Sequence, residues 1–371
     1  MTLDELPTPC LILDRDRLDR NLAAMAGALA RHGVPLRPHM KTAKSIDVAR
    51  RALAGQPGGI TVSTLAEAEY FAAYGIADIL YAVGITPWKL DQVARLNADG
   101  ADIAVITDDP ATAAAIAAHP RPPRTLIEID TGEGRGGVGP GDPLLVELAA
   151  RLGGCLAGVM THGGHSYAGR TPAEMARVAE AERVGVTAAA ERLRAAGHAV
   201  GIVSMGSSPT ALAAASLAGI TEVRAGVYMF GDLFQAEIGT HGIDDIAVTV
   251  LTSVIGRRAG QVLVDAGGIA LSKDRSTEAA PKDYGYGLVL DRLGGRAFGD
   301  SIVRRAYQEH GVIAFDPADP RAGVLGDLPV GGRLRIAPNH VCMTAAAHDR
   351  YYVVDGGGEE IVAVWSRVNG W

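Results

Sequence analysis

The sequence is poor in cysteine and contains no long hydrophobic run. Its three cysteines, Cys10, Cys155 and Cys342, are odd in number and widely spaced, so they do not suggest the disulfide framework of a small secreted domain. The longest apolar stretches are far shorter than a membrane span and are interrupted by Gly, Asp or Arg. The first six residues include two acids and no apolar run, which argues against a signal peptide. We therefore expect a cytoplasmic protein with reduced thiols and no membrane partner.

An excess of positive charge is also missing. The 35 Lys and Arg residues are outnumbered by 42 Asp and Glu residues, giving a net charge of −7, which argues against nucleic acid as a partner. No Gly-x-Gly-x-x-Gly turn follows the first expected strand of the repeat, which disfavours a dinucleotide-binding open sheet. What the chain does have is 371 residues, 48% of them hydrophobic. That length accommodates a barrel of about 250 residues and a second, smaller unit.

Short apolar runs and helical patterns alternate with regular spacing through the first two thirds of the chain. Eight strands, each followed by a connection that is mostly helical, are typical of a (β/α)8 barrel. We therefore predict this fold for residues 14–240. The expected strands are residues 35–40, 59–63, 78–83, 102–106, 125–129, 156–160, 201–204 and 222–224.

The pattern changes beyond residue 240. Short β-type runs recur there without regular helical spacing between them, which predicts a mostly β domain over residues 241–371. Near the N-terminus, Thr8–Leu13 predicts a further short strand, which the prolines at positions 7 and 9 confine to an edge or entry position. We expect residues 1–13 to join the β domain.

In such a barrel the loops that follow the strands form the active-site face. Lys41 follows the first strand, and a lysine amine that is partly screened from water at this position can attack a carbonyl group. After the seventh strand, Gly206–Thr210 is a run of small residues that opens a helix, where backbone amides can hold a phosphate. A nucleophilic amine facing a phosphate cradle suggests a phosphorylated aldehyde bound as a Schiff base, a description that pyridoxal phosphate fits.

Other polar residues lie in the same set of loops. His162 and His165 are flanked by glycines, so contact with substrate or cofactor is as reasonable for them as a packing role. His39 is more typical of a residue that shapes the turn after the first strand. Lys44 is better interpreted as a phosphate-side or surface charge than as a second nucleophile.

A possible metal pair lies in the predicted β domain. On an extended chain, residues two apart point the same way, so His340 and Cys342 could share one ion. An imidazole and a thiolate suit Zn²⁺ better than Mg²⁺ or Ca²⁺. Alone, however, this spacing more often belongs to a capped histidine and a buried cysteine.

These motifs together resemble the fold-type III pyridoxal-phosphate enzymes of the alanine-racemase-like superfamily. The resemblance is to the branch that holds eukaryotic-type D-serine dehydratase, D-threonine aldolase and the D-3-hydroxyaspartate dehydratases and aldolases. The matching segments span nearly the whole chain in the family's order. They are TPCLILD (8–14), RPHMKTAKS (37–45), EIDTGEGRGGV (128–138), THGGHSY (161–167), SMGSSPT (204–210), RAGVYMFGD (224–232), DAGGIALSKD (265–274) and PNHVCMT (338–344).

The resemblance implies roles for individual residues. Lys41 would bind the cofactor covalently and act in catalysis, with Tyr167 and His165 as further catalytic residues. Arg135 would contact the phenolic oxygen of the cofactor. The remaining cofactor contacts would come from His162, Tyr167, Gly206, Ser207, Ser208, Gly226 and Tyr228, and the catalytic metal would be bound by His340 and Cys342.

The His-x-Cys pair favours one branch of this family. Dehydratase relatives use His-x-Cys, whereas the aldolases more often use His-x-Asp with Mn²⁺ or Mg²⁺. We therefore predict a zinc-assisted dehydratase that converts a β-hydroxy D-amino acid, such as D-serine, D-threonine or D-threo-3-hydroxyaspartate, into a 2-oxo acid and ammonia. The alternative is an aldolase that releases glycine and an aldehyde.

A racemase or a non-enzymatic pyridoxal-phosphate protein fits less well. A racemase should need a second acid or base, usually a tyrosine from the β domain, and no metal. The non-enzymatic proteins resemble an isolated barrel. The resemblance also implies a homodimer, because related enzymes complete the pocket with the partner's β domain.

Overall fold

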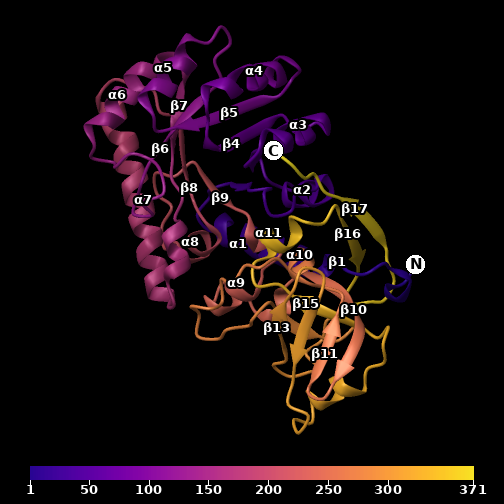
Figure 1. Ribbon diagram of the computed structural model, residues 1–371. Coiled ribbons are helices and arrows are strands. Elements are labelled where there is room, and N and C mark those ends of the chain that lie inside the picture. The colour runs from indigo at the N-terminus through magenta and orange to yellow at the C-terminus, as the bar shows by residue number, and fades with distance from the viewer. The chain divides into compact units, whose positions relative to one another are not determined.

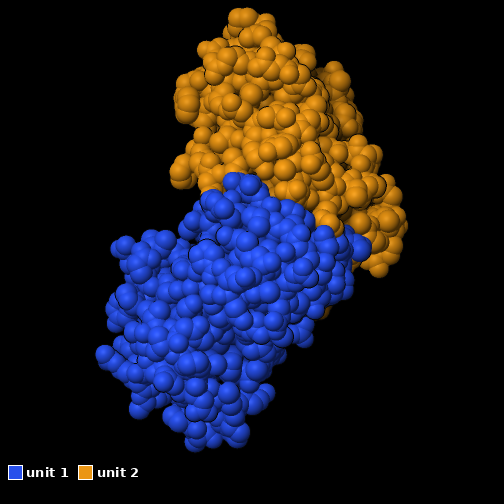
Figure 2. Space-filling model, turned by 90° about the vertical axis from the view of Figure 1, so that its right-hand side faces the viewer, with its two compact units in different colours: residues 1–23, 227–367 blue, residues 24–226, 368–371 orange.

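The computed structural model describes residues 1–371, which fold into two compact units (Figures 1 and 2). The first, which we call the barrel unit, contains residues 24–226 and 368–371. The second, which we call the β unit, contains residues 1–23 and 227–367. Helix α1 (Arg15–Ala30) contributes to both. None of the helices combines the length and the hydrophobicity needed to cross a membrane.

The barrel unit is built on an eight-stranded sheet in which every strand pair is parallel. A parallel bridge between His39 and Thr61 brings the two end strands of this sheet together, so the sheet closes. The predicted barrel is confirmed. In sheet order the strands are β2 (Leu36–Pro38), β9 (Glu222–Ala225), β8 (Ile202–Met205), β7 (Leu156–Met160), β6 (Thr125–Glu128), β5 (Asp102–Thr107), β4 (Asp78–Gly84) and β3 (Ile60–Val62).

Helices surround this sheet (Figure 1). The longest, α7 (Pro172–Ala195), begins in a capping box in which Thr171 and Glu174 satisfy each other's backbone amides, and Pro172 occupies its first turn. The strands are buried almost throughout, as expected for a parallel sheet that is covered by helices on its outer face. The other helices are α2 (Ile46–Ala52), α3 (Leu65–Ala73), α4 (Leu90–Ala98), α5 (Pro110–Ala118), α6 (Pro143–Leu152) and α8 (Ser208–Ala213).

The segment 37–45 runs from the interior of the barrel to its rim. Arg37, in β2, is buried and pairs with Glu222 at 2.7 Å and with Asp78 at 2.9 Å, two acids that begin β9 and β4. Lys41 lies beyond the other end of β2, where the active-site loops gather. The ion pairs of Arg37 therefore belong to the end of the barrel opposite Lys41.

The β unit contains a nine-stranded, mostly antiparallel sheet. Strand β1 (Cys10–Asp14) lies between β10 and β16, antiparallel to the first and parallel to the second, so the N-terminal strand joins the β domain as predicted. An additional pairing of β10 with β11 curls part of the sheet into a barrel-like closure. The strands are β10 (Val248–Arg258), β11 (Gln261–Val264), β12 (Leu288–Leu290), β13 (Ile302–Ala306), β14 (Gly311–Ala314), β15 (Arg333–Ala337), β16 (Arg350–Val354) and β17 (Ala363–Ser366).

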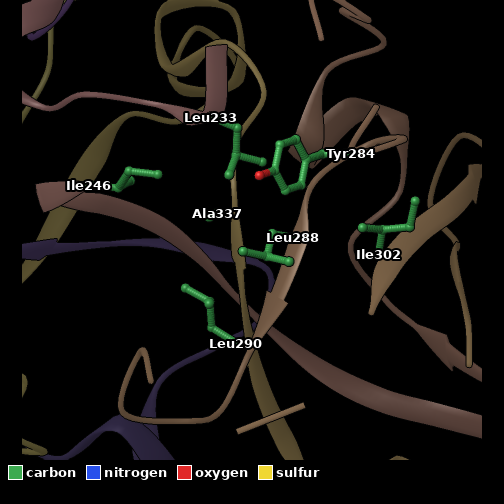
Figure 3. Packing of buried hydrophobic residues seen from close by; sticks show 7 residues of the cluster. All are labelled: Leu233, Ile246, Tyr284, Leu288, Leu290, Ile302 and Ala337. Atoms are coloured by element: carbon green, nitrogen blue, oxygen red, sulfur yellow. The ribbon is translucent and has the colours of Figure 1, made fainter. Parts of the chain in front are cut away.

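Three short helices interrupt the β unit, and the last two of them lie beyond residue 240, where the sequence predicted no regular helix. They are α9 (Leu233–Glu237), α10 (Gly268–Leu271) and α11 (Val341–Ala345). Three residues separate β15 from α11, and Ala337, the last residue of β15, belongs to an apolar cluster (Figure 3). Its members are Leu233, Ile246, Tyr284, Leu288, Leu290, Ile302 and Ala337, all nearly inaccessible to solvent.

Candidate active site

Lys41 lies in the turn between β2 and α2, with its side chain exposed. Its backbone N–H donates to Nδ1 of His39 at 3.4 Å. Within this single chain, the protein itself therefore leaves the Lys41 side chain accessible to solvent. Lys44, by contrast, is only 17% exposed and pairs with the buried carboxylate of Glu67 at 3.2 Å, so it serves as a structural charge.

Two histidines share the electrostatic surroundings of Lys41. Burial and then the positive charge of Lys41 lower the pKa of His162 to about 3, and the same two causes lower the pKa of His39 well below its ordinary value. His162 is therefore neutral, and its Nδ1–H donates to the carbonyl of Gly206 at 2.9 Å. Its Nε2 is left as a hydrogen-bond acceptor. Lys41, His39 and His162 thus gather at one end of the barrel.

The turn after β8 is shaped by close backbone contacts. Gly206 has φ of +130°, and a Cβ there would lie 2.4 Å from the carbonyl oxygen of Arg224. At the end of β9, a Cβ on Gly226 would lie 2.8 Å from the carbonyl oxygen of His39. Only glycine fits either position. At both turns the glycine therefore leaves its own backbone uncovered by a side chain.

Hydroxyl groups line the same turn. Ser207 caps α8, accepting from the N–H of Thr210 at 3.3 Å, and its hydroxyl is 3.1 Å from that of Ser166. Ser208, in the first turn of α8, is buried. Backbone amides, hydroxyl groups and the nearby amine of Lys41 match the chemistry of a phosphorylated aldehyde. The residues present therefore fit pyridoxal phosphate.

Arg135 is carried by the loop after β6. Its guanidinium lies 3.5 Å from Glu133 and 3.8 Å from Glu128, with 56% of the side chain exposed. The loop is braced by Asp130, which accepts from two loop amides, and by Asp108, which accepts from a third at 2.6 Å. Arg135 is thus presented to solvent by a constrained loop.

Tyr167 and His165 lie in the 3-10 helix Gly164–Ala168, in the loop after β7. His165 approaches the Arg135 loop, where a Cβ on Gly132 would lie 3.5 Å from its Nε2. Its buried Nδ1 has no hydrogen-bond partner within the protein. The half-buried Tyr167 accepts from Arg170 through its carbonyl oxygen at 2.9 Å. An unpartnered buried nitrogen at this position can receive a bond from a ligand.

Tyr228 belongs to the β unit, in the short 3-10 helix that follows β9. Its side chain is almost fully buried, and burial raises the pKa of its phenol above the usual range. Its carbonyl oxygen accepts from Nε2 of His241 at 2.9 Å. The phenol is therefore neutral and able to donate a hydrogen bond.

His340 and Cys342 lie at the junction of β15 and α11 in the β unit. Nδ1 of His340 is 3.1 Å from Oδ2 of Asp274, and the sulfur of Cys342 interacts with the same ring. Burial opposes the charged form, but Asp274 and Cys342 outweigh it and raise the pKa of His340 to about 11. Without a metal, the protonated ring is therefore favoured. The donor set of imidazole and thiolate is one that fits a transition metal.

The reason given for this pair from the sequence is wrong, although the two side chains do meet. The chain is not extended through Cys342, because α11 begins at Val341. His340 is the extended N-cap residue of that helix, and Cys342 lies in its first turn. No cluster of three or more His, Cys, Asp or Glu side chains in the chain could hold a metal.

Comparisons with known proteins match both parts of the chain. The alanine racemase N-terminal domain family matches residues 13–233, and the D-serine dehydratase domain family matches residues 247–354. D-threo-3-hydroxyaspartate dehydratase from Delftia sp. strain HT23 is 46% identical, over 100% of this chain and 99% of the relative. The chain belongs to the alanine-racemase-like, fold-type III pyridoxal-phosphate enzymes.

Other members of this family are more distant. The 3-hydroxy-D-aspartate aldolase of Paracoccus denitrificans is 30% identical, over 98% of this chain and 92% of the relative.

The solved structure of the Delftia dehydratase has a TM-score of 0.95 and covers each chain completely. Two further structures of that enzyme, each with a TM-score of 0.95, are a cysteine-to-alanine variant in the metal-free form and a histidine-to-alanine variant two positions earlier in the chain.

Glu182, in α7, is a further residue beside this site that was not among the residues predicted from the sequence. Its side chain is fully buried, and Oε1 accepts from the N–H of Gly206 at 2.8 Å. The same Gly206 peptide therefore donates to Glu182 and accepts from His162. A signal was present, because Val178, Glu182 and Val186 share one helical face that is otherwise apolar.

Glu182 should make the stability of the cofactor-free protein depend on pH. Burial raises its pKa from 4.5 to about 7, so between these values the native state holds a proton that the unfolded chain has released. Stability contributed by the protonated form is complete below pH 4.5 and is lost as the pH rises through 7. Above pH 7, Glu182→Gln, which stays neutral, should raise the free energy of unfolding by up to roughly 3 kcal/mol.

Urea denaturation of both proteins at pH 5 and pH 8 measures this effect. Glu180→Gln is the matched control, because Glu180 is an exposed glutamate of the same helix. The control should keep the pH dependence of the parent protein. An unchanged pH dependence in Glu182→Gln would show that this carboxyl does not titrate in the stated window.

Proposed function

We propose that this pyridoxal-phosphate lyase is a metal-assisted dehydratase of β-hydroxy D-amino acids, with D-threo-3-hydroxyaspartate as the first candidate substrate. It would yield a 2-oxo acid and ammonia. The observation that carries the proposal is the contact between His340 and Cys342 in a chain that matches the Delftia dehydratase from end to end. The cysteine and the histidine substituted in the variants of that enzyme are also two residues apart in sequence, like Cys342 and His340 here.

The cofactor would be held by the residues gathered at the rim of the barrel. Lys41 is the proposed covalent anchor, and Arg135 and His162 are proposed contacts to the ring. The proposed phosphate contacts in the barrel unit are the hydroxyls of Ser207 and Ser208 and the backbone at Gly206 and Gly226, where glycine leaves no side chain in the way. Tyr228, in the β unit, is a further proposed contact. When bound, pyridoxal phosphate supplies an electron sink for charge that develops at the substrate's α-carbon.

Lys41 would also act as the general base. Its amine is the candidate to receive the α-proton at Nζ, because burial and the charge of Lys41 lower the pKa of His39 and His162 too far for either imidazole to hold that proton. Tyr167 and His165 are proposed to orient the substrate on the same face.

His340 and Cys342 would act on the leaving group. A metal ion bound there supplies a Lewis acid that makes the β-hydroxyl a better leaving group. We infer Zn²⁺ because imidazole and thiolate suit it better than they suit Mg²⁺ or Mn²⁺, which favour oxygen ligands. A thiolate ligand needs reduced Cys342, as expected in the cytoplasm.

The inferred homodimer can be checked by light scattering.

Product analysis tests the proposed reaction. Protein reconstituted with pyridoxal phosphate and Zn²⁺ is given D-threo-3-hydroxyaspartate, D-serine and D-threonine in turn. We expect ammonia and a 2-oxo acid in equal amounts, and the fastest turnover with D-threo-3-hydroxyaspartate. Glycine with an aldehyde would instead establish an aldolase, the second candidate, which the relatives at 30–31% identity favour.

A further inference from the structure

The carboxylate of Asp274 lies directly against the imidazole of His340. Its Oδ2 is 3.1 Å from Nδ1 of the ring. Its other oxygen accepts hydrogen bonds from both the backbone N–H, at 2.7 Å, and the hydroxyl group of Ser276. Both carboxylate oxygens are therefore engaged, and Nε2 is the ring nitrogen that remains for a cation.

A second contact locks the same two segments together. The side-chain amide of Asn339, which is only 3% exposed, donates to the carbonyl oxygens of Asp274 at 3.2 Å and Gly285 at 2.6 Å. Its own oxygen accepts from the hydroxyl of Thr277 at 3.1 Å. Asn339, which precedes His340, thus holds the backbone of Asp274, and the carboxylate of Asp274 contacts the His340 ring.

A neighbouring acid, Asp232, bonds to backbone amides. Its carboxylate accepts from the backbone N–H of Val341 at 3.0 Å and from that of Gln235 at 2.8 Å. It therefore caps α9 and braces the backbone of the motif. Asp274 is the acid that contacts the imidazole.

We propose that Asp274 is the positioning residue of the metal site. It holds the His340 ring in the tautomer that carries its proton on Nδ1, so that the lone pair of Nε2 faces the ion, and its charge makes Nε2 a stronger donor. Ser276 and Asn339 keep the carboxylate in place. The inference rests on the proposed metal role of His340 and Cys342.

Co²⁺ titration of the metal-free, cofactor-loaded protein tests this role. A charge-transfer band between Co²⁺ and a thiolate reports ligation by Cys342 independently of turnover. Asp274→Asn keeps the shape and an acceptor oxygen but loses the charge, and we expect Co²⁺ affinity to fall roughly 10- to 100-fold. Asp283→Asn, in the same segment, removes a carboxylate that pairs with Arg275 at 2.7 Å, and it should bind Co²⁺ like the parent protein.

The variants separate the inference from the function on which it rests. If Asp274→Asn binds Co²⁺ as tightly as the parent while His340→Ala does not bind, Asp274 only anchors the segment and the inference is overturned. If His340→Ala retains the affinity and the thiolate band, the metal role of His340 fails instead. Visible cofactor absorbance and the melting temperature verify that each variant is folded.

A second variant keeps the test decisive if Asp274→Asn does not fold. Ser276→Ala leaves the carboxylate in place but removes the hydroxyl that holds its far oxygen. Co²⁺ affinity should then fall by a few-fold with the thiolate band preserved. Unchanged affinity in Ser276→Ala would count against a positioning role for Asp274.

Discussion

Lys41→Gln is expected to lose both the visible absorbance of the covalently bound cofactor and nearly all turnover. Glutamine keeps most of the side-chain length but has no amine, so it can neither bind an aldehyde covalently nor accept the α-proton. General base catalysis alone contributes about 10²- to 10⁴-fold, so a loss of roughly 10⁴-fold or more is expected when the anchor is removed as well. Absorbance spectra and initial rates after reconstitution with fresh pyridoxal phosphate measure the two effects.

Lys44→Gln is the matched control for this experiment. Lys44 lies three residues away, but its amine pairs with the buried Glu67, and a glutamine amide can still donate to that carboxylate. The control should therefore keep its absorbance and its rate. Retention of visible absorbance in Lys41→Gln, or its loss in Lys44→Gln alone, would transfer the anchoring role away from Lys41.

The barrel could be predicted from the sequence because its strands are short, buried apolar runs separated by helical patterns. The β unit was harder to predict. Strands β12, β13 and β14 have little local pattern, since they lie in or next to a stretch rich in Gly, Asp and Arg. Their strand status depends on pairing with distant partners, as when β12 pairs with β15.

The same contrast holds at the site. Lys41, His340 and Cys342 could be singled out because their residue types carry chemistry wherever the chain places them. Glu182 could be noticed as a charge on an apolar helical face, but neither its partner nor that of Asp274 could be predicted, because these partners lie 24 and 66 residues away in sequence. The extended chain predicted at Cys342 from local spacing is wrong. A helix begins there instead, and it still leaves the thiol beside the imidazole.

Cys342→Ala is expected to separate two events that the parent enzyme performs together. The variant should keep its visible cofactor absorbance and continue to exchange the substrate's α-proton with D₂O, because Lys41 and the turn proposed to bind the phosphate belong to the barrel unit and are unchanged. Loss of the β-hydroxyl should slow by roughly 10³-fold, since Lewis-acid activation of a leaving group contributes several kcal/mol. Proton NMR in D₂O follows exchange, and 2-oxo acid formation follows elimination.

Chelation of the parent enzyme should reproduce this behaviour, and added Zn²⁺ should restore elimination in the parent but not in Cys342→Ala. Cys155→Ala serves as the control, since Cys155 is a partly exposed thiol in the barrel unit. If chelated parent enzyme and Cys342→Ala both eliminate at the full rate, no metal acts on the leaving group. If α-proton exchange is lost together with elimination, the metal is needed to seat the substrate before Lys41 can act, and the division of labour between amine and metal is incorrect.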